Sequence, residues 1–237
     1  MFGITRTRTA SKSLKNVAQS HPCNPLDISK SIKDKLRALL RETAQPVAVV
    51  TSFMPPNSSS TSHRFHGATL SSFTSIAMDP YPLIAFALRM PSRMASSLDA
   101  AQPDQTSHMV VNLLSAEQAS ISVKFSRPDL YPEPFSSIPY SLSEEGLPII
   151  GDSLGAISCK LVSKAIPLHD LELLKGESSD EVMKPLLEDC PSSNLFIAHV
   201  TRVESSPSDN EDSLPLLYHR RQYTSCQIPP RSLAMDP

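Results

Sequence analysis

The sequence lacks the signatures of several large classes of protein. Its 6 glycines stand against 22 prolines, and it contains neither a GxGxxG pattern nor a P-loop, which argues against a Rossmann dehydrogenase. It has no run of about eighteen apolar residues, so we expect no transmembrane helix and no membrane partner. The formal net charge of −2 gives no reason to expect nucleic acid as a partner.

The cysteines are widely separated and form no CxxC pair; they are Cys23, Cys159, Cys190 and Cys226. This spacing predicts reduced intracellular thiols rather than a disulfide framework or a metal site, and Cys159 is expected in the core. His63 and His66 have no matching carboxylate or Cys nearby in the sequence, and we interpret them as surface residues. We therefore expect no metal.

The 237 residues are enough for one domain with a sizeable core. Short β-branched and apolar runs between turn signals predict strands at 46–52, 66–72, 83–89, 110–114, 156–166, 194–203 and 216–218. Helices are expected at 28–43, 95–101 and 116–125, and residues 127–145, which contain four prolines, are expected to form a long ordered loop. This content predicts a mainly β barrel.

The two ends of the chain differ from the middle. Residues 1–26 contain Arg, Lys, Ser and Thr but no acid, which is typical either of a mitochondrial transit peptide or of an ordinary disordered tail. Residues 27–223 are the predicted domain, and residues 224–237 a flexible tail. The helix at 28–43 has one apolar stripe, expected to pack on the barrel, formed by Ile28, Ile32, Leu36, Leu39 and Leu40.

The most informative stretch runs from Gly67 to Arg93. It contains a run of hydroxyl side chains, then an apolar strand at 83–88, then Ser92 and Arg93 at the start of a short helix. Hydroxyls, backbone N–H groups at strand ends and a nearby Arg suit an anionic ligand such as a phosphate. The alternative is an ordinary solvated loop.

The order of residues in this stretch resembles the flavin reductase-like family of the FMN-binding split barrel. The resemblance is carried by Gly67-x-Thr-x-Ser-Ser-Phe-x-Ser75, Asp79-Pro80, Ser92-Arg93, Met109 to Ser115 with Gln118, Gly146-Leu-Pro-Ile149, Cys159, 195–197 and 216–218. It covers about residues 44–223.

The resemblance implies a split antiparallel β-barrel of Greek-key type with a few peripheral helices, which forms a homodimer with FMN at the subunit boundary. It places phosphate and ribityl contacts on Thr69, Ser71, Ser72, Ser92 and Arg93, with Asn112 beside the flavin ring. The implied function is an NAD(P)H-dependent flavin reductase, with FMN as cofactor and NADH or NADPH as co-substrate. The resemblance identifies no catalytic residue, because hydride transfer to a flavin needs no protein nucleophile or base.

Two other interpretations remain open: an FMN-binding module of the same fold without turnover, or a barrel scaffold for protein contacts. Two departures from the family's motifs bear on these interpretations. Pro191, Ser192 and Ser193 replace the family's Gly-Asp-His, which puts nicotinamide use in doubt, and neither His169 nor His199 holds the matching position. Arg221 replaces a Gly in the family's Tyr-x-Arg-Gly-x-Tyr ending, so the backbone there is expected to differ. The expected location is mitochondrial, or otherwise cytoplasmic.

Overall fold

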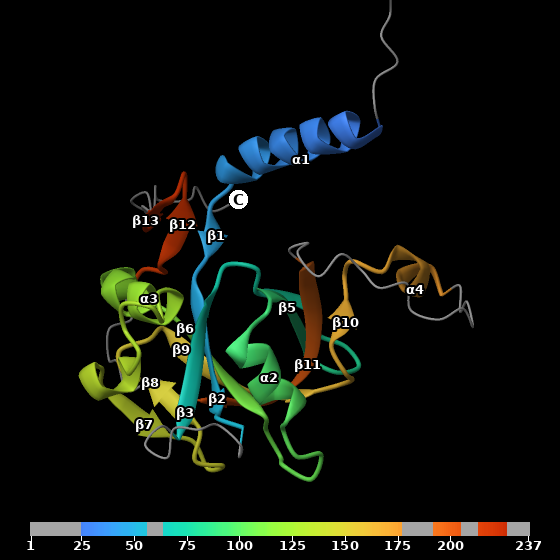
Figure 1. Cartoon of the computed structure of the whole chain (residues 1–237). Coiled ribbons are helices and arrows are strands. Elements are labelled where there is room, and N and C mark those ends of the chain that lie inside the picture. The colour runs from blue at the N-terminus through green and yellow to red at the C-terminus, as the bar shows by residue number, and fades with distance from the viewer. Residues whose placement is uncertain (1–24, 56–63, 177–191, 205–212, 227–237) are drawn as a thin grey trace, which may run out of the picture. The chain divides into compact units, whose positions relative to one another are not determined.

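The structure is a computed structural model that describes residues 25–55, 64–176, 192–204 and 213–226 (Figure 1). The chain divides into two compact units, Met1–Leu40 and Arg41–Pro237. Helix α1, Pro25–Arg41, confirms the helix expected at 28–43. Its apolar residues Ile32, Leu36 and Leu39 are exposed, and their packing on the barrel stays a prediction.

The second unit is organised around one antiparallel sheet. Eight strands take part, in the order β3-β2-β6-β9-β11-β5-β4, and β10 pairs with β11 off this path. Their bounds are β2 Ala48–Phe53, β3 Phe65–Leu70, β4 Thr74–Ala77, β5 Leu83–Met90, β6 Met109–Leu113, β9 Gly155–Leu161, β10 Ile166–Pro167 and β11 Ser192–Glu204.

The sheet curls until its two ends approach each other. β3 and β4 lie at opposite ends of the strand order, yet residues 71–73 alone connect them, so the sheet must bend round into a half-barrel (Figure 1). Its interior holds a buried apolar cluster, in which the rings of Phe86 and Phe196 stack with centroids 5.4 Å apart. The prediction of a mainly β, split antiparallel barrel with few helices is confirmed.

Smaller elements surround this sheet. They are helices α2 Arg93–Asp99, α3 Ala119–Ser126 and α4 Leu171–Lys175, the 3-10 turns η1 Ala116–Gln118 and η2 Pro134–Ser137, the hairpin β7 Tyr140–Leu142 with β8 Pro148–Ile150, and a small sheet of β1 Gln45–Pro46, β12 Leu217–His219 and β13 Gln222–Thr224. α2 and α3 agree with the helices expected at 95–101 and 116–125.

Strands β4, β7 and β13 are among those that were not predicted from the sequence. β4 was missed because three of its four residues are exposed, so that no apolar alternation marks it. β7 lies inside 127–145, where only a loop was expected; all three of its residues are exposed, and among the described strands it pairs only with β8. β13 follows the expected last strand and ends at Thr224, inside the segment expected to be a tail.

The structure also shows where individual cysteine and histidine residues lie. Cys159 is fully buried in the core as predicted, and burial raises the pKa of its thiol to about 12. His66 is partly buried, which corrects its interpretation as a surface residue, whereas His63 lies outside the described residues. The described residues contain no cluster of His, Cys, Asp or Glu that could hold a metal, and no described helix is long and apolar enough to span a membrane.

Candidate functional site

The hydroxyl side chains that follow β3 lie at the point where the sheet closes. Ser71 and Ser72 are exposed in the turn between β3 and β4. The Ser72 hydroxyl donates to the Ala87 carbonyl and accepts from the Ala87 N–H, both at 3.0 Å. These two bonds continue the pairing of β4 with β5 and fix the turn beside the end of β5.

β5 leads directly from Ala87 to the other two predicted contacts, Ser92 and Arg93. Ser92 is the N-cap of α2, and its hydroxyl oxygen accepts from the Ala95 N–H at 3.3 Å. The Ser92 hydroxyl proton therefore remains available to a ligand. Arg93 is exposed and forms no ion pair within the described part of the chain. Ser72 is thus fixed beside β5, and Ser92 and Arg93 follow the end of the same strand. We call the turn that holds Ser71 and Ser72, together with Ser92 and Arg93 after β5, the rim.

Thr69 and Asn112 have partners inside the protein instead. The Thr69 hydroxyl donates to the Ser122 carbonyl at 2.7 Å, which ties β3 to α3. Asn112 is fully buried; its amide nitrogen donates to the Val49 carbonyl, and its amide oxygen accepts from the Ile150 N–H at 2.8 Å. Both side chains have structural roles in this arrangement, and their contact with a flavin stays a prediction.

His66 lies close enough to Arg93 to be influenced by its charge. Burial of the ring, and secondarily the positive charge of Arg93, lower the pKa of His66 to about 4. The imidazole is therefore neutral at physiological pH and adds no charge to that of Arg93.

A cavity of about 510 Å³ opens beside Arg93. Its walls come from the first residues of β3, the end of α3, residues 128–136 and β7, and they include Arg64 and Lys124 as well as several aromatic rings. Sequence reasoning missed this cavity because its walls are far apart in the chain and meet only when α3 packs against β3. No local motif marks Lys124 as a partner of Arg93.

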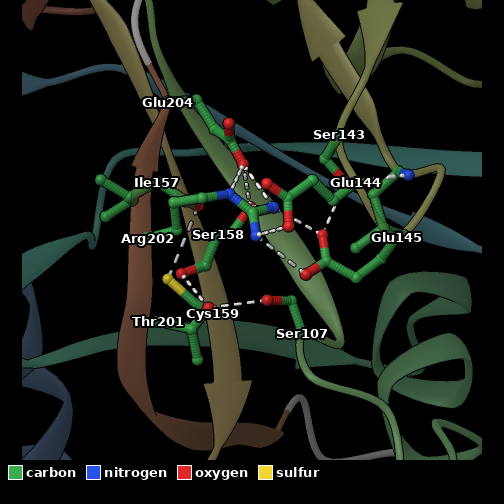
Figure 2. A network of polar contacts seen from close by, with 11 residues as sticks. Ser107, Ser143, Glu144, Glu145, Ile157, Ser158, Cys159, Thr201, Arg202 and Glu204 are labelled. Carbon is green, nitrogen blue, oxygen red and sulfur yellow. Dashed lines mark hydrogen bonds and ion pairs between the residues drawn. The ribbon is translucent and has the colours of Figure 1, made fainter.

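A polar network fixes the turn between β7 and β8 (Figure 2). Arg202 on β11 donates to Glu204 at 2.8 Å and to Glu145 at 2.7 Å, and it reaches Glu144 at 3.1 Å. The hydrogen bonds and charge of Arg202 lower the pKa of Glu145. These contacts tie the turn to the main sheet, and therefore hold the hairpin that supplies one wall of the cavity.

The segment that replaces the family's Gly-Asp-His reaches the same rim. Ser192 and Ser193 begin β11 and pair with Met90 and Arg89, next to Ser92. The Leu168 N–H donates to the Ser193 carbonyl at 2.9 Å, so the next residue, His169, lies beside the replaced motif and is exposed. His199 lies at the other end of β11, where it pairs with Leu83 and contacts the ring of Tyr81.

Arg221, which replaces the family's Gly, has a backbone conformation that suits glycine. Arg220 and Arg221 connect β12 to β13 with φ values of 48° and 65°. Two central residues with positive φ are typical of a tight type I′ hairpin turn. Arg221 thus occupies a left-handed conformation that a Gly would adopt without steric cost, and Arg220 pairs with Glu42.

The curled antiparallel sheet with few helices defines a mainly β split barrel, and comparison with known proteins identifies the family. The chain belongs to the flavin reductase-like domain family, whose model matches residues 40–227. This confirms the resemblance deduced from the motifs.

Individual relatives agree with this assignment. A flavin reductase of Pseudomonas putida is 33% identical over 153 residues, which are 62% of this chain and 82% of the relative. The FMN reductase (NADH) SmoA of Agrobacterium fabrum is 29% identical over 111 residues, 47% of this chain and 58% of its own length. The styrene monooxygenase flavin reductase of Pseudomonas putida S12 shares the fold, with a TM-score of 0.59 at 24% identity over 82% of this chain and 99% of that structure.

Proposed function

We propose that the protein is a flavin reductase that uses NADH or NADPH to reduce FMN. The single observation that carries the proposal is the match of residues 40–227 to the flavin reductase-like family; the hydroxyls of Ser71, Ser72 and Ser92 and the charge of Arg93 support it. The names of its relatives, a flavin reductase and an NADH-dependent FMN reductase, support the same activity.

The residues at the rim fit a flavin mononucleotide. Arg93 can make a two-pronged contact with a phosphate, and its charge is not offset by an ion pair in the described chain. The exposed hydroxyl of Ser71 and the free hydroxyl proton of Ser92 can donate to phosphate or ribityl oxygens. The donors are thus chemically matched to an anionic, hydroxyl-rich ligand.

A bound FMN would supply the redox chemistry, hydride transfer from a reduced nicotinamide. The protein's task is to hold the two ligands in contact and to limit access of water. Arg93 and the hydroxyls would hold the phosphate end, and the hydrogen bonds of Ser72 to β5 would keep that end in place. His169, exposed beside Ser193, would be available to the nicotinamide in place of the family's histidine.

A homodimer is part of the proposal. Large apolar side chains are exposed on and after the edge strand β4: Ile76 is 49% exposed, Tyr81 63% and Met78 70%. An edge strand with such side chains is usually covered, and a second copy of this chain would cover it next to the rim. Sedimentation of wild type and Met78→Asp tests this: a dimer that the substitution dissociates supports the proposal, and a monomeric wild type contradicts it.

The decisive experiment for the activity is oxidation of NADH or NADPH by the purified protein with added FMN. Oxidation that depends on FMN, followed at the nicotinamide absorbance, is the expected result. Bound FMN without oxidation of either nicotinamide would instead identify a non-catalytic FMN-binding module, which the names of the relatives do not favour.

Mitochondrial import directed by residues 1–26 is the remaining part of the proposal. The absence of acids and the presence of Arg6, Arg8, Lys12 and Lys15 support it. A fusion of these residues to a fluorescent reporter is expected to reach mitochondria, and a diffuse cytoplasmic signal would contradict it.

A further inference from the structure

Three large apolar side chains of α1 are exposed on one face of the helix. Ile32, Leu36 and Leu39 have exposed fractions between 51% and 65%, and they follow one another at spacings of four and three residues, which places them side by side on a helix. We call these three side chains the exposed stripe. A continuous apolar row on a surface helix marks a site of interaction.

Cations outnumber carboxylates on this helix. Its charged residues are Lys30, Lys33, Lys35, Arg37 and Arg41, with Asp27 and Asp34. Asp34 pairs with Arg37 at 3.1 Å, whereas none of the three lysines forms an ion pair within the described residues. At about 100° per residue, Lys33 and Lys35 lie on opposite sides of the exposed stripe. From there their apolar stems can cover the same surface as the stripe while the ammonium groups reach out to anions.

The positive charge of the protein is concentrated in the first part of the chain. Residues 1–41 contain nine Lys and Arg and two Asp, a net charge of +7, whereas the whole chain has a net charge of −2. Residues 42–237 therefore have a net charge of −9. Such a separation of charge indicates an anionic partner for the basic segment, which the charge of the whole chain conceals.

The turn between β12 and β13 adds a cation at the end of α1. The Arg220 N–H donates to the Arg41 carbonyl at 3.1 Å, which holds this turn at the last residue of the helix. Arg220 pairs with Glu42, but Arg221 is exposed and forms no ion pair in the described part of the chain. Arg221 has a φ of 65°, where a Gly would have no steric cost. A basic surface around α1 gives the arginine at this position a role.

We propose that α1 binds the surface of an anionic phospholipid bilayer, lying in the plane of the interface with the exposed stripe among the acyl chains and Lys33 and Lys35 among the phosphates. Basic amphipathic helices bind membranes in this way, and they need no apolar run long enough to span. The expectation of no membrane partner rested on the lack of such a run and does not extend to this helix. The stripe distinguishes a bilayer from a nucleic acid, which would leave the apolar side chains in water.

The experiment is sedimentation of the full-length protein with vesicles of phosphatidylcholine, with and without phosphatidylglycerol. Wild type is expected to bind the anionic vesicles, and to lose this binding at high salt or without phosphatidylglycerol. Leu36→Glu should weaken binding at least about tenfold, because one buried apolar side chain is lost. Glu has nearly the helix propensity of Leu, so the helix itself is kept. Lys33→Gln and Lys35→Gln should each weaken binding about fivefold.

Val162→Glu is the matched control. Val162 is 57% exposed and lies outside α1, and the substitution changes the charge as Leu36→Glu does, so vesicle binding should stay unchanged. Equal losses in the two variants, or no binding of wild type to anionic vesicles, would overturn the proposal. Weakening by the lysine substitutions without weakening by Leu36→Glu would indicate a purely electrostatic partner such as a nucleic acid, and would overturn it as well.

Urea unfolding without vesicles tests the remaining occupants of the exposed stripe. If the stripe packs on the barrel, as expected from the sequence, or on a second copy of the chain, Leu36→Glu lowers the unfolding midpoint far more than Val162→Glu, and the proposal fails. Equal midpoints are expected. FMN binding should be the same in wild type and Leu36→Glu, since α1 is separate in sequence from the rim, so the outcome does not depend on the proposed function.

Discussion

The hydroxyl of Ser72 bonds to both backbone groups of Ala87, donating to the carbonyl and accepting from the N–H at 3.0 Å each. Through this one side chain the turn after β3 is fixed to β5, although β3 and β5 lie near opposite ends of the strand order. The relationship fixes the turn that contains Ser71 to the strand that leads to Ser92 and Arg93.

Ser72→Ala is expected to lower the free energy of unfolding by about 1 kcal/mol, because both hydrogen bonds are lost in an exposed position where water can replace them. FMN affinity should fall as well, since the turn is no longer fixed. Ser71→Ala is the control: Ser71 is exposed, so its stability effect should stay within a few tenths of a kcal/mol. Urea unfolding and FMN titration of both variants check this. Equal stability of Ser72→Ala and Ser71→Ala would contradict the role given to Ser72.

The hairpin between β12 and β13 offers a stabilising substitution. Arg221 has a φ of 65°, where a residue with a side chain is disfavoured by about 1 kcal/mol or more relative to Gly. Arg221→Gly should raise the free energy of unfolding by about 0.5 kcal/mol, once the greater freedom of Gly in the unfolded chain is subtracted. Gln222→Gly, one residue further on in β13, should destabilise instead. A loss of stability in Arg221→Gly would show that the arginine side chain contributes more than its backbone costs.

Glu145 makes stability depend on acid pH. Its folded pKa lies below the ordinary value of 4.5, mainly because Arg202 donates to it. Its contribution is therefore present above pH 4.5 and is lost as the pH falls through the lower, folded pKa. Glu144 and Glu204 also contact Arg202.

Glu145→Gln should accordingly be less stable than wild type at neutral pH and lose less stability on acidification. The matched control is Asp129→Asn, because the pair of Asp129 with Arg127 is well exposed and contributes little. Thermal unfolding across the acid range measures both. Parallel pH profiles for wild type and Glu145→Gln would contradict the assignment.

His169 is the histidine that the fold brings next to the replaced Gly-Asp-His motif. His169→Ala is expected to raise the KM for NADH or NADPH about five- to tenfold, an effect on the order of 1 kcal/mol, while FMN affinity stays unchanged. His199→Ala is the comparison, since His199 lies at the far end of β11 against Tyr81. Steady-state kinetics at saturating FMN distinguish them, and an unchanged KM in His169→Ala would remove His169 from the nicotinamide site.

Much of the barrel could be predicted from the sequence because buried strands keep their apolar patterns. Residues 83–89 were predicted as a strand, and β5 has four fully buried positions. β4 and β7 were missed because their side chains are exposed, so pairing with a neighbour defines them rather than burial. A single sequence carries no signal for such pairing.

Only part of the candidate site could be predicted from the sequence. Ser92 and Arg93 were chosen because the family resemblance places phosphate contacts there, after the end of a strand and near the start of a short helix. Lys124 was not, since only the packing of α3 on β3 brings it to the cavity that Arg93 lines. Asn112 was predicted at the ring on the strength of a motif, whereas its hydrogen bonds show that the same residue type also serves to join β2, β6 and β8.

The most direct test of the central claim, that the rim at Arg93 binds the flavin phosphate, is a titration of FMN and riboflavin into wild type and Arg93→Ala. Loss of the charge-assisted contact should cost about 1.5–3 kcal/mol, so FMN affinity should fall roughly ten- to a hundredfold. Riboflavin lacks the phosphate and should be affected much less, and the difference between the two ligands should shrink at high salt. Equal weakening of FMN and riboflavin would show that Arg93 does not contact the phosphate, and would contradict the account.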